Sequence, residues 1–403
     1  MQPRPDPDPD AAPALDAAPA LDAATPAPDA ATPAPAPAPA RFACASCGGA
    51  LSYAPGADAL ECPFCGHRNE VRVANPWAAA AALRELDYAA ALADTLGAAE
   101  TTQARVVPCA SCGAEVEFAA AEAAALCPWC ATPLVSAPVT HRVLRVRGVL
   151  PFAVDDRAAH GAMAAWLGGL WLAPSGLAQF ARKRRKLDGL HVPCWTFDAD
   201  TITAYRGQRG DTYHETRMIR VQTDKGARTE ARQIPKIRWR AVSGEVRRAF
   251  DDILRPATRA LDAAAFERLG AWDLSALEPY DPRYLAGFRA EAHTIPLADG
   301  YAQARAIMDR RIERDVRFDI GGDRQRIEAL STEVRDVTFK HILVPVWLAA
   351  YRYRGKAYRI SINGRTGQVH GERPWSPWKI AIAVALGALV AAGAGYLVAT
   401  GQR

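Results

Sequence analysis

Apolar and polar residues alternate with period two in several runs of the segment 141–373, and this pattern predicts β-strands. The clearest runs lie at 218–222, 236–242 and 358–362. Asn363-Gly364 ends the last run and Gly367-Gln368-Val369 begins a returning strand, as in a hairpin. Helical periodicity intervenes at 155–170, 177–186, 258–269 and 300–317. Together these patterns predict an α+β body with a mainly antiparallel sheet.

The first two helices of this body carry candidate surfaces. An apolar face of Met163, Trp166, Leu167 and Leu170 is more typical of a core-facing helix than of a binding site. The second helix ends in five consecutive basic residues, Arg182, Lys183, Arg184, Arg185 and Lys186. This run could hold phosphates of a nucleic acid or of lipid headgroups. It could equally be a solvated helix end whose cations suit the helix dipole.

The body also repeats a short motif. Val192-Pro193-Cys194-Trp195 recurs as Val344-Pro345-Val346-Trp347, and each copy is followed by a Tyr-Arg-Gly element that we interpret as a turn. These elements are Tyr205-Arg206-Gly207 and Tyr353-Arg354-Gly355. This repeat of the motif predicts two related β units. Because Cys194 stands where the second copy has Val346, we expect a small buried apolar residue there rather than a reactive thiol.

The C-terminal pattern is different, because no charge occurs between Ile380 and Gly401. Such a run is long enough to cross a bilayer core of about 30 Å, so we expect one transmembrane helix at 379–402. Trp375, Trp378 and Lys379 suit the membrane interface. Four basic residues (Arg359, Arg365, Arg373 and Lys379) precede the span and only Arg403 follows it, so the positive-inside rule predicts that the body faces the cytoplasm.

Small residues recur along this tail at every fourth position. They are Ala383, Gly387, Ala391, Gly395 and Ala399. Small residues at this spacing let two membrane helices approach closely, so the tail could form a homodimer. Composition is the alternative explanation, since the tail is rich in alanine and glycine throughout.

The opposite end of the chain has no core-forming pattern. Residues 1–40 consist largely of alanine and proline, which favour polyproline II structure and cannot bury a core. We expect a disordered spacer here. The segment also lacks the basic start and apolar run of a secretory signal.

Eight cysteines form two copies of one spacing, C-x2-C-x14-C-x2-C, displaced by 65 residues. The candidate metal ligands are Cys44, Cys47, Cys62 and Cys65 in the first copy, and Cys109, Cys112, Cys127 and Cys130 in the second. Each C-x2-C turn presents two sulfurs to one ion, and a short hairpin returns the second pair to complete a tetrahedron. We predict zinc ribbons at 41–73 and 105–140, separated by a spacer helix at 74–104.

The four sulfurs of each unit leave no coordination position open, so these metals are predicted to be structural and not catalytic. Zinc is the expected ion, and iron is the alternative for a tetrahedron of thiolates. Disulfides do not suit a chain without a secretory signal, and a redox C-x2-C site needs a βαβ context that is missing here. Reduced cysteines again place the body in the cytoplasm.

Charge and motif composition narrow the function classes. The formal net charge of +5 among 403 residues would fall to near zero with eight thiolates around two divalent ions, so it argues little for nucleic acid. The chain has no phosphate-binding G-x4-G-K-[ST] loop, no H-E-x-x-H, no G-x-S-x-G and no G-x-G-x-x-G. We therefore expect that it is not an enzyme, although a site assembled in space within the body is an open alternative.

Three segments of the body carry a resemblance to a known family. They run from Ile237 through Trp239 to Gly244 with Phe250 onward, from Pro279 to Phe288, and from Phe339 to Trp347. They resemble an uncharacterised bacterial family with N-terminal zinc ribbons and a C-terminal membrane helix. Its members are often labelled primosomal-protein-N′-like or TFIIB-type zinc-ribbon proteins. The helicase activity in the first label is not expected here, since a helicase needs the missing phosphate loop.

The resemblance and the residues together predict a zinc-ribbon protein of the bacterial inner membrane, single-pass and facing the cytoplasm. Its expected role is a binding or adaptor module with protein partners. A membrane-associated nucleic-acid-binding protein is the alternative, through the ribbons and the basic run at 182–186.

Overall fold

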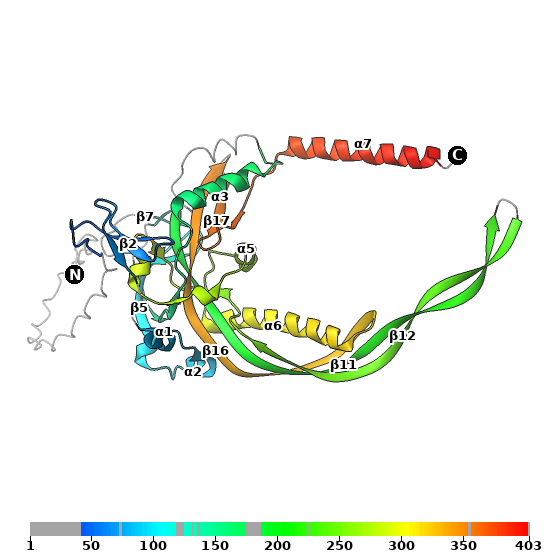
Figure 1. Cartoon of the computed structure of the whole chain (residues 1–403), viewed down its shortest axis with the longest axis horizontal. Coiled ribbons are helices and arrows are strands. Elements are labelled where there is room, and N and C mark those ends of the chain that lie inside the picture. Colours follow the sequence, from blue (N-terminus) through cyan, green and yellow to red (C-terminus); the bar gives the residue numbers. More distant parts are fainter. Residues whose placement is uncertain are drawn as a thin grey trace, which may run out of the picture. The chain divides into compact units, whose positions relative to one another are not determined.

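The structure is a computed structural model that describes residues 42–71, 75–117, 125–130, 132–134, 138–171, 173–174, 187–223, 226–353 and 356–401 (Figure 1). All of these residues cluster into a single unit. The N-terminal spacer, the helix expected at 177–186 and its basic run lie outside the described residues, so the expectations placed on them stay predictions.

Three long strands dominate the fold: β11 (Asp188–Thr223), β12 (Gly226–Phe250) and β16 (Arg324–Tyr353). In the largest sheet the strand order is β12-β11-β16-β10-β14, and the long strands pair antiparallel. The strand β17 (Lys356–Asn363) joins β16, and β18 (Val369–Gly371) joins β17, so the hairpin predicted around Asn363-Gly364 is confirmed. The α+β class with a mainly antiparallel sheet is confirmed as well.

Short strands complete this sheet. The strand β10 (Gly148–Val149) pairs parallel to β16 and antiparallel to β14 (Glu278–Pro279). Two others join β11: β13 (Arg255–Pro256) antiparallel and β15 (Arg289–Ala290) parallel. A fifth, β4 (Leu86–Asp87), pairs with β16. These two-residue strands bring distant loops against the long strands, and the sites described below are built on them.

The strand β11 is far longer than the sequence pattern predicts. Its pairing with β12 continues from Ala199 opposite Phe250 to Thr223 opposite Gly226. The expected turn at Tyr205-Arg206-Gly207 is therefore wrong, because these residues lie inside β11, where the register against β16 shifts between Arg206 and Gly207. A Cβ on Gly207 would lie 2.4 Å from the carbonyl oxygen of Arg326. Glycine thus permits a close approach of two strands at a bulge, rather than a turn.

Alternation along β16 gives the sheet two apolar faces. Leu343, Trp347 and Ala349 enter one hydrophobic cluster, whereas Ile342, Val344, Val346 and Leu348 enter another. The two Val-Pro-x-Trp segments lie beside each other here, with Val192 opposite Val344. Their relation as two β units stays a prediction. The predicted burial of Cys194 is confirmed, since this residue is completely buried in the second cluster.

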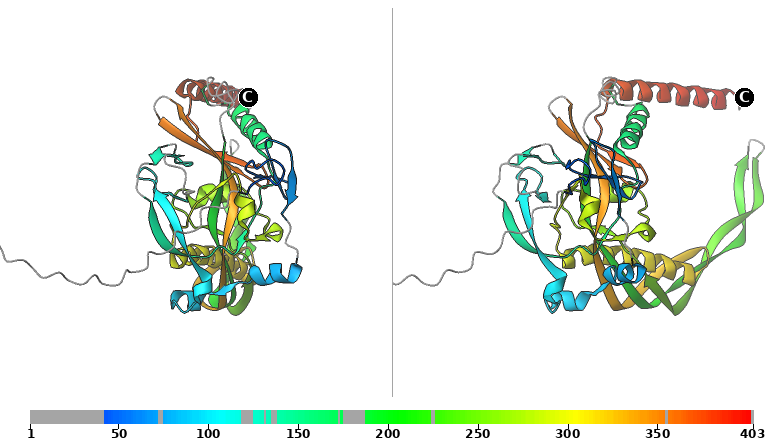
Figure 2. Two further views of the ribbon diagram at one scale, coloured as in Figure 1. Left: turned by 90° about the vertical axis from the view of Figure 1, so that its left-hand side faces the viewer. Right: turned by 60° about the vertical axis from the view of Figure 1, so that its left-hand side comes forward.

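The helix α6 (Leu297–Ile320) covers the sheet where β11, β12 and β16 run together (Figure 2). Its buried stripe of Ala304, Met308, Ile312, Val316 and Ile320 recurs every fourth residue and packs against Trp195, Phe197 and Phe339. Two further expected helices are α3 (Asp156–Gly168), capped by Asp155, and α5 (Ala263–Arg268). Single 3-10 turns occur at Ala98–Glu100, Leu274–Ala276 and Pro282–Leu285.

The spacer helix expected at 74–104 is wrong as a single element. The structure has two short helices, α1 (Pro76–Ala82) and α2 (Tyr88–Leu92), on either side of β4. Leu86 is buried opposite Phe339 of β16, so this segment joins the sheet instead of continuing the helix. Asp87 then caps α2 by accepting a hydrogen bond from the backbone N–H of Ala90.

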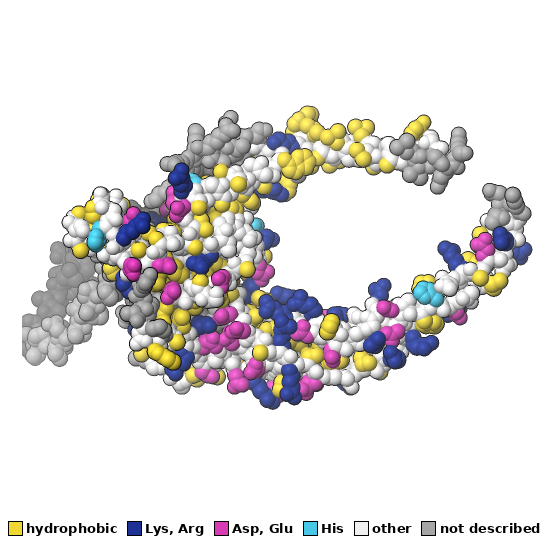
Figure 3. All heavy atoms as spheres, in the orientation of Figure 1, with side chains coloured by type: hydrophobic (Ala, Val, Ile, Leu, Met, Phe, Trp, Pro, Cys, Tyr) yellow, Lys and Arg dark blue, Asp and Glu magenta, His cyan; other side chains and the backbone are white. Residues whose placement is uncertain are grey.

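The last helix, α7 (Pro377–Gly401), is exposed along its apolar length (Figure 3). Within the described ranges it is the one helix long and apolar enough to cross a membrane, by length and composition. Leu389 and Val390 expose 68% and 73% of their surfaces. Side chains this apolar are seldom left contiguous in water, which agrees with the predicted span.

The tight contact between α6 and β11 gives a first prediction. A Cβ on Gly300 would lie 2.5 Å from Cδ1 of Trp195, which is fully buried and donates its indole N–H to Ile295 O. We expect Gly300→Ala to lower the free energy of unfolding by about 1–3 kcal/mol through overpacking. Thermal or urea unfolding would measure the change.

The matched control is Gly161→Ala in α3, where an added Cβ meets no atom within 4 Å. This change should raise stability by about 0.5–1 kcal/mol, because alanine is the better helix former. Equal destabilisation by both variants would contradict the contact between α6 and Trp195.

Candidate metal centres

The first cysteine unit forms a compact cluster of four sulfurs. The Sγ atoms of Cys44 and Cys65 lie 3.5 Å apart, as do those of Cys47 and Cys62, and all four lie within 4.8 Å of one another. The strands β1 (Ser52–Ala54) and β2 (Ala59–Glu61) form a hairpin between the two C-x2-C turns, and β3 (Arg68–Glu70) follows the second turn and completes the sheet. The hairpin that the spacing predicts is therefore present.

Glycine follows each of these turns in a left-handed conformation. Gly48 and Gly66 have φ of 72° and 73°, and their N–H groups donate to the carbonyl oxygens of Cys44 and Cys62. A residue with a Cβ would be strained at such a φ. The turn thus closes tightly enough to direct both sulfurs toward one point.

The second unit repeats this geometry. Its Sγ pairs, Cys109 with Cys130 and Cys112 with Cys127, are each 3.6 Å apart. Gly113 has φ of 73°, whereas Ala131, at the fourth such position, lies outside the described residues. The surrounding strands are β5 (Thr101–Pro108), β6 (Glu115–Glu117), β7 (Ala125–Leu126), β8 (Pro133–Leu134) and β9 (Val139–Leu144).

These distances fit a metal better than disulfides. All eight cysteines are free thiols, and a disulfide would bring two sulfurs to about 2.05 Å. A tetrahedron with metal–sulfur bonds of about 2.3 Å separates its sulfurs by about 3.8 Å. Both clusters approach that separation, so each could hold one metal ion with four sulfur ligands.

Within each cluster the pKa values of the thiols are shifted in opposite directions, because neighbouring thiols share hydrogen bonds. Burial raises the pKa of Cys62, but hydrogen bonds from the N–H groups of Cys65 and Phe64 and from neighbouring thiols lower it overall to about 7. In the second cluster a hydrogen bond from the Cys127 thiol lowers the pKa of Cys112 to about 5. A thiol that donates in this way holds its own proton more tightly, so the pKa of Cys127 is raised. Metal binding would displace such protons.

Each ribbon packs against the body instead of standing apart from it. From the first ribbon, Leu51, Tyr53 and Leu60 share a hydrophobic cluster with Phe152 and Trp347. The Tyr53 N–H donates to Ala286 O at 2.8 Å, and the Tyr284 hydroxyl donates to Val71 O at 3.2 Å. In the left view of Figure 2 the two ribbons, blue and cyan, lie on opposite sides of the long strands.

The second ribbon is fastened through Trp129, between Cys127 and Cys130. Its indole N–H donates to Oε2 of Glu291 at 3.0 Å, and the Thr258 hydroxyl donates to Oε1 at 2.5 Å. Glu291 is buried, which raises the pKa of its carboxyl group to about 8. It follows β15, which pairs with β11. A buried carboxyl thus connects the second metal cluster to the centre of the sheet.

A third group of possible ligands is occupied by a side chain. Oxygen atoms of Glu85, Asp198 and Asp252 lie within 4.8 Å of one another. The Lys340 ammonium lies 2.8 Å from Oε1 of Glu85 and 3.0 Å from Oδ1 of Asp252, and Thr338 also donates to Glu85. The ammonium supplies the positive charge that a cation would bring. We therefore assign this group to the packing of β4 on β16, and not to metal binding.

Protons in this carboxylate group are shared unequally. Burial and the adjacent Glu85 raise the pKa of Asp198 to about 7. Burial acts against ionisation of Glu85, but hydrogen bonds from Asp198 and Lys340 outweigh it and lower the Glu85 pKa to about 2. Asp198 thus keeps a proton that it donates to Glu85, while its Oδ1 accepts the N–H of Asp252 at 2.6 Å.

In comparisons with known proteins, no family model, no curated protein and no solved structure matches this chain. The family resemblance carried by the body segments therefore stays a prediction. The two cysteine clusters are compatible with zinc ribbons on their own geometry.

The clusters predict the metal content of the purified protein. We expect two ions per chain, and Cys62→Ser or Cys127→Ser should each remove one, because three sulfurs bind far more weakly than four. Elemental analysis measures this ratio. The control is Cys194→Ala, which removes the ninth cysteine outside both clusters and should leave two ions. Less than one ion per chain in wild-type protein purified without chelators would contradict both centres.

A second prediction concerns the Asp198 proton. Because its folded-state pKa lies above the unfolded value, its contribution to stability is full below about pH 4 and is lost as the pH rises through about 7. Asparagine keeps its N–H donor at every pH, so Asp198→Asn should match wild type at about pH 4, where the Asp198 stabilisation is still nearly full. At pH 8 it should gain on the order of 1 kcal/mol.

Thermal unfolding at both pH values tests this prediction. The control is Asp200→Asn, two residues further along β11 at an exposed position, which should change little at either pH. A gain for Asp198→Asn that is the same at pH 4 and pH 8 would show that the proton is not retained.

Proposed function

We propose that the chain is a membrane-anchored zinc-ribbon protein that acts as a binding or adaptor module facing the cytoplasm. The observation that carries this proposal is the contrast between α7 and the rest of the described chain. The helix α7 exposes its apolar side chains along its length, whereas both cysteine clusters are packed against the body. An exposed apolar helix is stable in a bilayer. Because a ribbon packs on each face of the sheet, the body can act as a rigid binding unit beside the membrane.

Zinc is the metal that we assign to both clusters. Four thiolates in a tetrahedron suit zinc or iron, and a structural zinc site is closed in this way. Four of the candidate metal ligands are also core residues, because they are buried among apolar side chains: Cys44, Cys62, Cys109 and Cys127. Loss of the metal would therefore loosen the faces of the sheet as well as the ribbons.

The proposed location is the inner membrane of a bacterium, with one span and the body in the cytoplasm. Basic residues are concentrated on the body side of α7. The free thiols agree with a reducing compartment. Pairing of two α7 helices is part of this proposal. An added Cβ at Gly387 or Gly395 meets no atom within 4 Å. The face that carries these small residues is therefore open to a second helix.

The surface that we propose for partners is the outer part of the β11–β12 hairpin, residues 211–223 and 226–238. Pairing of β16 with β11 stops at Gly210 opposite Arg324, so this part has two strands, and no element of the described chain covers it (Figure 3). A lone two-stranded ribbon is only marginally stable in water. A long exposed hairpin of this kind suits contact with another macromolecule.

Nucleic acid is the second candidate partner, and one feature of the hairpin favours it. Arg217 lies directly opposite Arg232, a position where like charges are destabilising, and within the described residues only Arg217 has an acidic partner, Glu215 at 3.3 Å. Arg220, Arg228 and Arg232 form no ion pair with the described part of the chain. Binding to DNA or RNA that weakens steeply with added salt would favour this candidate over a protein partner.

The anchor is tested by removing it. Deletion of residues 379–403 should move the protein from the membrane fraction to the soluble fraction with both metals retained, because α7 packs little against the body. Fractionation with metal analysis measures both properties. The full chain, washed with high salt, should stay with the membrane. A truncated protein that still pellets after that wash would reveal a second anchor and contradict the proposed topology.

A further inference from the structure

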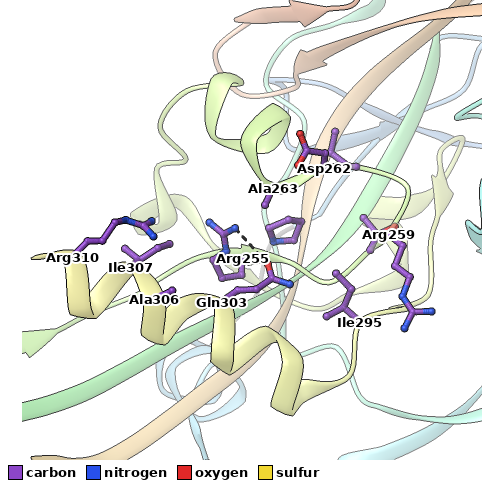
Figure 4. Close-up of a pocket in the computed structure, with 12 residues that line it drawn as sticks. Arg255, Arg259, Asp262, Ala263, Ile295, Gln303, Ala306, Ile307 and Arg310 are labelled. Atoms are coloured by element: carbon purple, nitrogen blue, oxygen red, sulfur yellow. Dashed lines mark hydrogen bonds between the residues drawn. The ribbon is translucent and has the colours of Figure 1, made fainter. Parts of the chain in front are cut away.

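A pocket of about 440 Å³ lies between α6, β13 and the loop that leads into α5 (Figure 4). Gln303, Ala306, Ile307 and Arg310 line it from α6, where their spacing places them on one face. Pro256, Leu261 and Ile295 supply apolar wall. It lies apart from both cysteine clusters, and neither the metal centres nor the membrane anchor uses it.

The inner end of this pocket holds a buried arginine. Arg255 of β13 is 5% exposed. One guanidinium nitrogen donates to Glu267 at 2.7 Å and another donates to Oε1 of Gln303 at 3.4 Å, while Nε has no hydrogen-bond partner. Burying an arginine costs free energy unless its charge and donors are compensated. Glu267 is more than half exposed, so water weakens the compensation that it provides.

Two further arginines line the pocket without acidic partners. Arg259 and Arg310 are exposed and form no ion pair with any described residue. In Figure 4 the Arg310 side chain extends from α6 in the direction of Arg255. The one acidic lining residue, Asp262, already accepts hydrogen bonds from the N–H groups of Ala264 and Ala265 at the start of α5. The lining therefore carries an excess of positive charge.

A purely structural role for Arg255 accounts for only part of this arrangement. Its pair with Glu267 would hold α5 on β13 without any need for Arg310. Arg255 and Arg310 both line the pocket and their guanidinium groups carry like charges, and an anion bound between them would reduce their repulsion. The fork of donors on each group matches the oxygens of a phosphate or a carboxylate.

We propose that this pocket binds a small organic anion. Its phosphate or carboxylate group lies between Arg255 and Arg310, and its apolar part packs against Ile307, Ile295 and Pro256. Gln303 holds the Arg255 guanidinium in place through its Oε1, which leaves its amide N–H groups to donate to the ligand. The pocket is large enough for a molecule of several heavy atoms beyond the anionic group.

The test is calorimetric titration of the full chain in detergent with inorganic phosphate and, separately, with butyrate, at constant ionic strength. We expect saturable binding of at least one of the two anions. Which anion binds more tightly identifies the ligand group. Arg310→Ala should weaken binding about ten-fold or more, as expected for loss of a charged hydrogen bond. The exposed position without an ion pair makes this variant safe for folding.

The matched control is Arg314→Ala, one turn further along α6, which removes an exposed arginine that does not line the pocket. Its affinity should stay within about two-fold of wild type, because a distant surface charge is screened by salt. The proposal is overturned if neither anion saturates, or if the two variants bind equally well. Each variant should keep two metal ions per chain, which shows that any loss of binding is local.

Discussion

The antiparallel pairing of β11 with β16 is the constraint on which the rest of this structure depends. Successive side chains on a strand point to opposite faces, so one pair of long strands creates two apolar surfaces that must both be covered. The first ribbon and α3 cover one surface, and the second ribbon with α5 covers the other. Further along the same strands, α6 covers the sheet. The cysteine clusters thus belong to the elements that cover the two apolar faces of the sheet.

This arrangement explains why the short strands and buried polar groups lie where they do. A ribbon of about 30 residues has too little apolar surface to hold its place alone, so directional contacts fix it. Trp129 and Glu291 do this for the second ribbon, and Tyr53 and Tyr284 for the first. Trp129 lies in a ligand-bearing turn and Tyr53 in β1, and each contacts a segment that pairs with, or packs on, a long strand. Metal binding and the sheet are coupled through these few side chains.

Local signals in the sequence predict local structure well. Cysteine spacing predicts both clusters, Asp155 predicts the start of α3, and Asn363-Gly364 predicts the β17–β18 hairpin. Contacts between distant residues leave no such signal. Glu291 stands alone between alanines and becomes a ribbon contact only because β15 pairs with β11. Likewise, the alanine-rich segment after Asn75 is helical by propensity, but burial of Leu86 against β16 outweighs that propensity.

Lys340 and Arg255 lie beside the sheet and are compensated in different ways, and the difference separates a packing contact from the proposed binding site. Lys340 lies among three carboxyl groups, one of which, Asp198, keeps a proton because of its burial and the adjacent Glu85. The ammonium therefore has two acidic partners within reach, Glu85 and Asp252. Arg255 has one partly exposed carboxylate, while Arg310 extends toward it and brings a second positive charge. A buried guanidinium with incomplete compensation, beside a second positive charge, favours the binding of an anion in the adjoining pocket.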